Sequence, residues 1–542
     1  MSVPPRFPCP QMPSEMKIAK LMGIYPQAQD GRFFQRVCIP GGHLTGRQWC
    51  ALAQLARQLT PSTPLHLTTR QDIEIHDLSA GQIPSAQQAM ASAGLTCVGA
   101  GGDSVRNITV CPCSGLMQGC PDLHGLADLA AAAVREIEGV FALPRKFKIS
   151  FSACSNACGR PFINDLGFVL ARRDGAPGFR VIAGGSLGPN PATGIELFDL
   201  LPAEQVLGLV KAAVIVFNEH GDRTNRSKAR LRHIRQRVGD DAFRKLLLEE
   251  LEKQVKTDTG SAGRGNGSAE GTGSVKGTGS AGKGTGSAAI WRCLSPLSPR
   301  PEDRGPKTED QRPVQAGTGA FSANSENDEP VPFSPGPAGF AASLPLTFVD
   351  GDLSPAAADV LADLADAPGT AVRITTDHRV MLYGASAAHL SEAVGRHSVL
   401  APAATPQPTI VTCPGNRWCS RGLIDTQRLA GKVREIMLRP RDGNRHRQTT
   451  AESVPFARAV ICISGCPNGC SHSRVADIGV TGMKAQAEGV GELGAARQEA
   501  YSLFLDGGRG ITDALATPAG TRLNESDLLE QIAAALKQSS DR

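Results

Sequence analysis

The sequence has 542 residues, of which 41% are hydrophobic and 20% are charged, and its formal net charge is +5. This length exceeds what one hydrophobic core usually serves, so we expect a protein of two or more domains. Lysine and arginine are scattered along the chain, which argues against a nucleic-acid partner. No apolar run approaches the roughly 18 residues of a membrane helix, and the N-terminus lacks the features of a signal peptide, so we expect a cytoplasmic protein without a membrane partner.

Cysteine is abundant for a cytoplasmic protein, in which the reducing environment disfavours disulfides. Nine of the fifteen cysteines gather in short segments, which favours metal ligation or redox chemistry over a structural role. The nine are Cys111, Cys113, Cys120, Cys154, Cys158, Cys413, Cys419, Cys466 and Cys470. The other six stand alone, and we interpret them as small hydrophobic or loop residues.

The first half of the chain combines helical and strand patterns. Thr45 is the predicted N-cap of a helix that ends near residue 59, and the segment LHLTTRQDIEIHDL, residues 65–78, has the alternation of a half-buried strand. A strand then runs into the cysteine loop CPCSGLMQGC, residues 111–120, and a helix follows this loop. A second strand ends in Cys-x-Asn-x-Cys at residues 154–158, and an Asp-Leu-Gly triplet follows seven residues later.

The second half repeats these patterns. VRITTDHRVMLYG, residues 372–384, matches the strand with the paired threonines, and TCPGNRWC, residues 412–419, matches the first cysteine loop. Residues 466–470 repeat Cys-x-Asn-x-Cys with Asp-Ile-Gly seven residues later, and a helix closes the chain. The sequence therefore predicts an internally duplicated α+β protein.

The predicted organisation places a small sheet module before a larger one in each copy. Between the copies the sequence is rich in Gly, Ser, Thr and Pro and cannot bury enough apolar surface to fold, which predicts a flexible linker. The predicted segments are a small module at 16–100, a larger one at 101–255, the linker at 256–335, a small module at 336–405 and a larger one at 406–542.

Two pairs of cysteines in the second half have the arrangement of a metal site. The pairs are Cys413-x5-Cys419 and Cys466-x3-Cys470, each on a loop that leaves a strand, and together they present four thiolates. Four thiolates bind an iron–sulfur cluster or a structural zinc ion. Neither pair has the Cys-x2-Cys spacing typical of zinc, and a Pro-Asn-Gly turn that holds Asn468 suits backbone N–H groups directed at cluster sulfides. We therefore favour an iron–sulfur cluster, with zinc or a chance arrangement as alternatives.

These motifs, together with the doubled TTRQ-type segment, resemble the siroheme-dependent sulfite and nitrite reductase hemoprotein family over both halves of the chain. The resemblance implies two ferredoxin-like half-repeats and two siroheme-binding modules. It also implies a 4Fe–4S cluster on Cys413, Cys419, Cys466 and Cys470, with the Cys470 thiolate shared with the siroheme iron.

The resemblance also implies a set of substrate-binding cations. They are Arg70, Arg106, Lys146 and Lys148, which would bind the siroheme carboxylates and the oxyanion substrate. Lys146 and Lys148 lie two residues apart on an apparent strand, so their side chains are expected on one face. Each of these residues taken alone is more typical of a solvated surface, and only the full set favours a site.

The chain departs from the family pattern in two places. The first half has cysteines at equivalent positions, so Cys111, Cys120, Cys154 and Cys158 form a candidate second cluster, with Cys113 as a substitute for Cys111. The alternative is a remnant of the duplication. In the second half, Asp377 and His378 replace the first half's Arg70 and Gln71, so we expect one catalytic siroheme per chain.

The resemblance implies the six-electron reduction of sulfite to sulfide, and nitrite reduction to ammonia is the first alternative. Lys148 favours sulfite, because many nitrite reductases of the family have asparagine there. Less favoured alternatives are a precorrin-3B synthase, which shares the half-repeats, and an iron–sulfur electron carrier without heme. No dinucleotide-binding or flavin motif follows a strand, so the expected electron donor is a separate ferredoxin or flavoprotein reductase.

Overall fold

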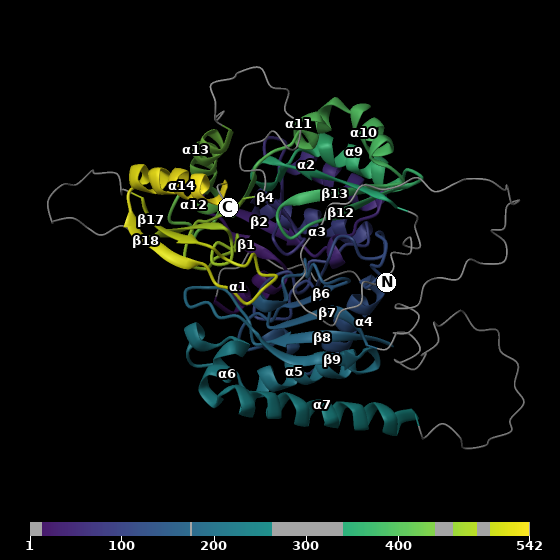
Figure 1. Ribbon diagram of the computed structural model, residues 1–542. Coiled ribbons are helices and arrows are strands. Elements are labelled where there is room, and N and C mark those ends of the chain that lie inside the picture. Colours follow the sequence, from purple (N-terminus) through teal and green to yellow (C-terminus); the bar gives the residue numbers. More distant parts are fainter. Residues whose placement is uncertain (1–12, 174–175, 263–339, 439–458, 485–498, 541–542) are drawn as a thin grey trace, which may run out of the picture.

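The computed structural model describes residues 13–173, 176–262, 340–438, 459–484 and 499–540. In Figure 1 the first larger module, coloured blue to teal, lies at the bottom, and the second larger module, coloured green to yellow, lies at the upper left. Most of the predicted linker falls outside these residues, although helix α7 continues through its first residues to Ala262. None of the helices described is both long and apolar enough to cross a bilayer.

The first half forms a small sheet module followed by a larger one. The helices and strands of this half are α1 (Pro13–Leu21), β1 (Ile24–Pro26), β2 (Arg32–Val37), α2 (Gly46–Leu59), β3 (Leu65–Leu67), β4 (Ile73–Ser79), α3 (Ile83–Ser92), β5 (Thr109–Val110), α4 (His124–Arg135), β6 (Ile149–Ser152), β7 (Leu166–Arg173), β8 (Ala176–Ala183), β9 (Ile195–Pro202), α5 (Val206–His220), α6 (Leu231–Val238) and α7 (Asp240–Ala262).

The second half repeats the order that the first half has from β2 to α5, with three additional short elements, β11, α11 and α12. Its helices and strands are β10 (Ala342–Thr347), β11 (Asp352–Leu353), α9 (Pro355–Asp366), β12 (Thr370–Ile374), β13 (Arg379–Gly384), α10 (Ala387–Gly395), α11 (Ala401–Ala404), β14 (Thr409–Thr412), α12 (Gly415–Trp418), α13 (Thr426–Leu438), β15 (Val460–Ser464), β16 (Ile478–Met483), β17 (Ala500–Leu505), β18 (Thr517–Leu523) and α14 (Glu525–Ser540).

The two larger modules contain the same sheet. One has the strand order β5-β6-β7-β8-β9 and the other β14-β15-β16-β17-β18, and in each the first three strands are parallel and the last two antiparallel. The Asp of each Asp-Leu/Ile-Gly triplet has the same role, since Asp165 accepts the Lys148 N–H and Asp477 accepts the Val460 N–H, both at 2.8 Å. This repetition confirms the duplicated α+β fold.

The two small modules share one hydrophobic core. Strand β11 of the second half pairs with β3 of the first, so it completes the five-stranded antiparallel sheet β1-β2-β4-β3-β11. Helices α2 and α9 pack against each other across the same boundary. Leu65 of the first half and Leu361 of the second are fully buried in one cluster, and the halves are therefore joined by a continuous apolar interior.

Each predicted strand with paired threonines is in fact a hairpin. Residues 65–78 divide into β3 and β4, and residues 372–384 contain the end of β12 and then β13, so the prediction of one continuous strand was wrong. The chain reverses at Gln71 (φ 62°) and His378 (φ 64°), which both adopt the left-handed conformation. The Thr68 hydroxyl accepts the Asp72 N–H at 3.0 Å and thereby closes the first turn.

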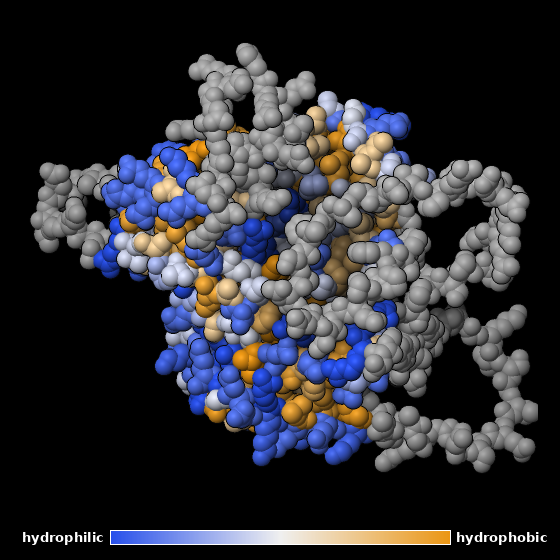
Figure 2. All heavy atoms as spheres, viewed as in Figure 1, coloured by the Kyte–Doolittle hydropathy of each residue, from blue (hydrophilic) through white to orange (hydrophobic). Residues whose placement is uncertain are grey.

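The predicted helices are present. Thr45 caps α2 in a capping box with Gln48, α4 follows the first cysteine loop, and α14 closes the described chain. On the face shown in Figure 2, hydrophobic residues lie in separate patches between hydrophilic ones. Such an alternation is ordinary for a folded surface.

Candidate functional site

The four cysteines of the second half follow the ends of two neighbouring strands. Cys413 directly follows β14 and Cys419 follows α12, whereas Cys466 and Cys470 lie in the turn after β15. Because β14 and β15 are parallel neighbours, both loops leave the sheet at the same edge. The Cys413 thiol accepts the Gly465 N–H at 3.0 Å and thus connects the two loops.

The surroundings of these thiols suit a metal centre. Burial raises the pKa of Cys413, Cys419 and Cys466, while the backbone N–H groups of Gly465, Arg421 and Asn468 act in the opposite direction. Buried thiolates without a metal are therefore disfavoured, and N–H groups already point at the sulfur atoms. Cys470 differs from the other three because it is exposed.

Glycine keeps space free between the two loops. A Cβ atom on Gly465 would lie 2.9 Å from the Gly415 Cα and 3.4 Å from the Cys413 Sγ. Gly469, between Cys466 and Cys470, has a φ of +66°, a conformation that favours glycine. A side chain at Gly465 would thus crowd the two loops, and one at Gly469 would strain the turn between Cys466 and Cys470.

Arg70 lies beside this cysteine loop, and Arg106 is close enough to Arg70 for their charges to repel each other. Arg70 extends from the turn between β3 and β4 and donates to Asn164 Oδ1 at 2.6 Å and to the Asn107 and Ile149 carbonyls at 2.5 and 2.9 Å. Burial lowers the pKa of Arg70 to about 10. Arg106 donates to the Gly102 carbonyl at 2.8 Å, and its buried Nε has no partner among the described residues.

Lys146 and Lys148 lie in the extended segment before β6. Between them, fully buried Phe147 forms an isolated bridge with Val105, so the segment alternates as a strand would. Neither ammonium has a hydrogen-bond or ion-pair partner among the residues that the structure describes.

The charges around these lysines leave an excess of positive charge. Burial lowers the pKa of Lys146 to about 7; Cys470 acts against this shift, whereas Arg230 and Arg106 add to it. The pKa of Lys148 is well below its usual value because of burial, Arg70 and Lys146. An anion would stabilise cations that depress each other's pKa, and both lysines are close enough to Cys470 for its charge to act on them.

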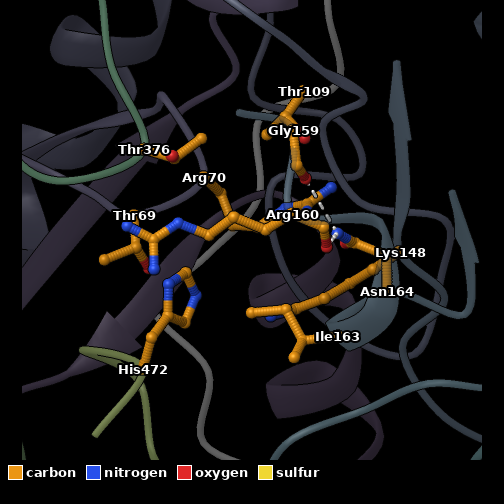
Figure 3. Close-up of a pocket in the computed structure, with 10 residues that line it drawn as sticks. All are labelled: Thr69, Arg70, Thr109, Lys148, Gly159, Arg160, Ile163, Asn164, Thr376 and His472. Carbon is orange, nitrogen blue, oxygen red and sulfur yellow. Dashed lines mark hydrogen bonds between the residues drawn. The ribbon is translucent and has the colours of Figure 1, made fainter. Parts of the chain in front are cut away.

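A small pocket opens where the two halves meet, as Figure 3 shows. His472 approaches it from the second half, whereas Lys148 and Asn164 approach it from the first. Arg160 also lines this pocket, and the buried His472 Nδ1 lacks a partner in the described structure.

Sequence reasoning missed Arg160 and His472. The duplication offered a signal, because each follows the last cysteine of its motif by two residues, Cys158 or Cys470. Both also have positive φ angles, 56° and 71°.

The small modules contact the cysteine turns in a crossed manner. The Thr69 hydroxyl donates to the Cys470 carbonyl at 2.8 Å, and Thr376 donates to the Cys158 carbonyl at 3.4 Å. The paired threonines noted in the sequence thus tie each half's hairpin to the other half's cysteine turn.

The turn between β12 and β13, which corresponds to the turn that holds Arg70, carries no unpaired cation. Asp377 accepts from Arg379, and this pair holds the pKa of Asp377 well below its usual range against the effect of burial. Burial lowers the pKa of His378 to about 3, so it is neutral. The cations that line the pocket, Arg70, Lys148 and Arg160, therefore all come from the first half, whereas burial lowers the pKa of His472 well below its usual value and leaves it neutral.

Cysteines also gather in the first half, but in a different combination from the candidate set. The Sγ atoms of Cys113, Cys120 and Cys154 lie within 4.8 Å of one another. Cys111 and Cys158 are outside this group, although the Cys111 thiol is 3.6 Å from that of Cys113. The structure thus gathers Cys113 with two of the four predicted residues.

Comparison with known proteins shows which protein families the chain resembles. The model of the nitrite and sulphite reductase 4Fe-4S domain matches residues 101–255 and 407–538, and the model of the nitrite/sulfite reductase ferredoxin-like half domain matches residues 25–93. Together these matches cover more than half of the chain.

Some of the similar proteins are named as nitrite reductases and others as sulfite reductases. The assimilatory ferredoxin-dependent nitrite reductase of Haloferax mediterranei is 27% identical over 500 residues, which cover 87% of this chain and 74% of that protein. The hemoprotein beta-component of the NADPH sulfite reductase of Acidithiobacillus ferrooxidans is 32% identical over 284 residues, 44% of this chain and 50% of that protein. The solved structure of the Mycobacterium tuberculosis NirA protein has a TM-score of 0.67 at 19% identity and covers 95% of this chain and 85% of that chain, which supports the fold.

Proposed function

The chain belongs to the nitrite and sulphite reductase family, and on that premise we propose that it reduces a small oxyanion by six electrons, with sulfite as the first candidate and nitrite as the second. The family's cofactors are a siroheme and a 4Fe–4S cluster. The paired cysteine loops and the unpaired cations suit these two groups. The proposal therefore concerns which residues hold them and which substrate is preferred.

In this proposal Cys413, Cys419, Cys466 and Cys470 hold the cluster. The N–H groups directed at these sulfur atoms stabilise their thiolate forms. Cys470 is the exposed member and the one whose charge acts on Lys146 and Lys148, so it is the thiolate nearest to the anion site. Asn468 supports the turn, since its backbone and side chain hydrogen-bond to Cys466.

Siroheme, when bound, supplies an iron at which the substrate is reduced and carboxylates that require cations. Arg70, Arg106, Lys146 and Lys148 provide those cations and a site for the oxyanion. Lys146, with a pKa of about 7, can donate a proton near neutral pH and regain it from solvent. Arg70 is fixed by three hydrogen bonds and binds charge without giving up its proton.

The observation that supports sulfite as the substrate is the presence of Lys148 beside Lys146. Neither lysine has a hydrogen-bond or ion-pair partner among the described residues. Sulfite carries up to two negative charges and loses three oxygen atoms, so a second ammonium both neutralises it and supplies protons. Nitrite carries one charge. It remains the second candidate because the relatives that match most of this chain, among them the protein from Haloferax mediterranei, are called nitrite reductases.

The other two alternatives have less support. An electron carrier without heme would not require the four predicted cations, two of which, Arg70 and Lys148, line the pocket, because buried positive charge costs free energy unless an anion neutralises it. Precorrin-3B synthase remains a formal alternative on its shared half-repeats. We propose a ferredoxin as the electron donor, since several relatives are named for one.

The test is parallel steady-state kinetics of sulfite and nitrite reduction with a viologen donor on wild type and Lys148→Asn. Asparagine keeps a hydrogen bond but removes the charge, so sulfite kcat/KM should fall by about ten- to a hundredfold while nitrite turnover is retained. Lys17→Asn removes an exposed lysine on α1 and should change neither value. If wild type prefers nitrite and the ratio is the same in Lys148→Asn, the nitrite reductase function replaces this proposal.

A further inference from the structure

The cysteines of the first half form a compact group of thiols that the reductase chemistry does not use. Cys113 and Cys120 lie in the loop between β5 and α4, and Cys154 lies in the turn after β6. This loop folds back on itself because the Gly115 N–H donates to the Cys120 carbonyl at 3.0 Å. A Cβ atom on Gly115 would lie 2.9 Å from the Asp122 side chain, so glycine permits the close return.

The duplication identifies the counterpart of each cysteine. The Cys111 thiol accepts the Ala153 N–H at 3.0 Å, as the Cys413 thiol accepts the Gly465 N–H at 3.0 Å. Cys111 is therefore the counterpart of Cys413, and Cys113, two residues further, is the counterpart of Gly415. The extra thiol in the first half stands where the cluster half has a glycine.

The same comparison shows that the first half has less room. Gly415 and Gly465 face each other in the second half, and one added Cβ would come within 2.9 Å of the opposite Cα. Cys113 and Ala153 occupy these positions in the first half. Two glycines that leave space for a large cluster are thus replaced by a thiol and a methyl group.

The spacing of the thiols fits a single ion. Four sulfur atoms around one tetrahedral zinc ion, at about 2.3 Å each, lie about 3.8 Å apart. In a four-iron cluster each cysteine binds a different iron, so the sulfur atoms lie farther apart. Within the described chain, Cys113, Cys120 and Cys154 are the one group of three or more candidate ligands whose atoms all lie within 4.8 Å, and the cluster cysteines of the second half do not meet that limit.

The site is shielded by the opposite half of the molecule. Tyr383 of β13 and Phe340 are buried against Leu116, and Cys113 packs against this apolar group. Cys111 and Cys120 are also buried. An apolar cover protects thiolates from water and oxidants, which suits a permanently bound ion.

We propose that Cys113, Cys120 and Cys154 bind one thiophilic divalent ion, Zn²⁺ or Fe²⁺, and that Cys111 is the nearest fourth thiolate. The ion would fasten the β5–α4 loop to the turn after β6 and leave the second-half cluster unchanged. This inference does not depend on the proposed function, because it concerns neither the cluster cysteines nor the cations.

The test compares two cysteine variants of the full-length holoprotein by metal analysis. Siroheme and one cluster together contain about five irons, so wild type should hold one ion beyond these five. Cys113→Ser should lose that ion, whereas Cys158→Ser should retain it, and both should keep the visible absorption of siroheme and cluster. A second cluster on Cys111, Cys120, Cys154 and Cys158 predicts the reverse order.

The outcomes are distinct. About nine irons in wild type, four of them lost in Cys158→Ser, would overturn the proposal in favour of a second cluster, and no metal beyond five irons would overturn it outright. If Cys113→Ser does not fold, the wild-type protein is measured instead, by X-ray absorption at the zinc edge or, if the ion is iron, by Mössbauer spectroscopy. A single ion surrounded by sulfur alone supports the site, and an iron neighbour at cluster distance refutes it.

Discussion

Gly465 controls the space next to the Cys413 thiol, and we predict that Gly465→Ala removes most of the cluster iron. The added methyl group would lie 2.9 Å from the Gly415 Cα and 3.4 Å from the Cys413 Sγ. Inserting a methyl group into a packed site costs about 1–3 kcal/mol, and here the strain falls on a cluster ligand. Iron analysis and the cluster absorption of the purified variant measure the loss.

Gly431→Ala is the matched control, because a Cβ atom at Gly431 in α13 meets nothing within 4 Å. Alanine is favoured over glycine inside a helix by about 0.5–1 kcal/mol, so the control should keep its iron and unfold at a slightly higher temperature. Full cluster content in Gly465→Ala would show that the loops move apart at little cost and would weaken the comparison of the two halves.

Local motifs explain why most candidate residues could be named from the sequence. Cys466 and Cys470 are four residues apart in one turn, and Lys146 and Lys148 alternate along one segment, so short spacing is enough to relate them. Arg160 and His472 were not named, because they lie in different halves of the chain and only the fold brings them to one pocket. The gathering of Cys113 with Cys120 depends on a loop that folds back at Gly115, which spacing alone does not reveal.

At the scale of elements, the pairing of β3 with β11 includes a titratable contact. His66 of β3 hydrogen-bonds to Asp352 of β11 at 2.9 Å, and the histidine is buried. Burial lowers the pKa of His66, but the hydrogen bond and the charge of Asp352 outweigh burial, so the pKa is raised. Burial lowers the pKa of the nearby His76, and it lowers the pKa of His378 to about 3.

We therefore predict that the stability difference between wild type and Asp352→Asn depends on pH. The pair stabilises the fold fully below the unfolded histidine pKa of about 6.5, and this contribution is lost as the pH rises through the raised pKa of the folded state. The variant should lose about 1.5 kcal/mol at about pH 6 and less at about pH 8.5. Thermal unfolding at the two pH values measures the difference.

Asp359→Asn provides the control, because Asp359 pairs with Arg57 across α2 and α9 at the surface and arginine does not titrate in this range. Its effect should be small and independent of pH. An equal loss at both pH values in Asp352→Asn would mean that His66 is neutral in the folded protein.

The elements themselves were predictable to different degrees. Helix α2 has both a capping box at Thr45 and an apolar stripe, so its start and extent followed from the sequence. The hairpin β3–β4 was taken for one strand, because Gln71 at the turn is neither glycine nor asparagine and gives no turn signal. Strand β11 is two residues long and pairs with a strand almost three hundred residues away, so no local pattern could indicate it.

At the scale of the whole molecule, each half supports the cysteine loop of the other. The Ala28 N–H of the first small module donates to the Trp418 carbonyl at 3.0 Å, beside Cys419. Tyr383 of the second small module covers the loop that carries Cys113. This crossed arrangement follows from the duplication, and it makes the cofactor site of one half depend on the folding of both.

The shared core leads to a prediction about the separated halves. Leu65 and Ile73 of the first half pack in one cluster with Leu346, Leu353 and Leu361 of the second, and all five are fully buried. Burying such a side chain contributes about 1.5–3 kcal/mol, so the separated halves would lose a contribution comparable to the stability of an ordinary domain. Residues 1–262 and 336–542, each expressed alone, should therefore aggregate or bind a hydrophobic dye, and the second fragment should lack cluster absorption.

Coexpression of the two fragments tests whether each one misfolds because it lacks the other half's share of the hydrophobic core. The alternative is that it misfolds because the covalent connection between the halves is absent. The fragments should purify as a one-to-one complex that contains siroheme and cluster, because the segment between them supplies none of the proposed ligands. A full-length protein shortened between residues 265 and 335 is the matched control and should have the cofactor content of wild type. If fragment 1–262 alone is monomeric and unfolds in one sharp transition, the first half has a sufficient core of its own. In that case the crossed contacts would orient two independent modules instead of completing one fold.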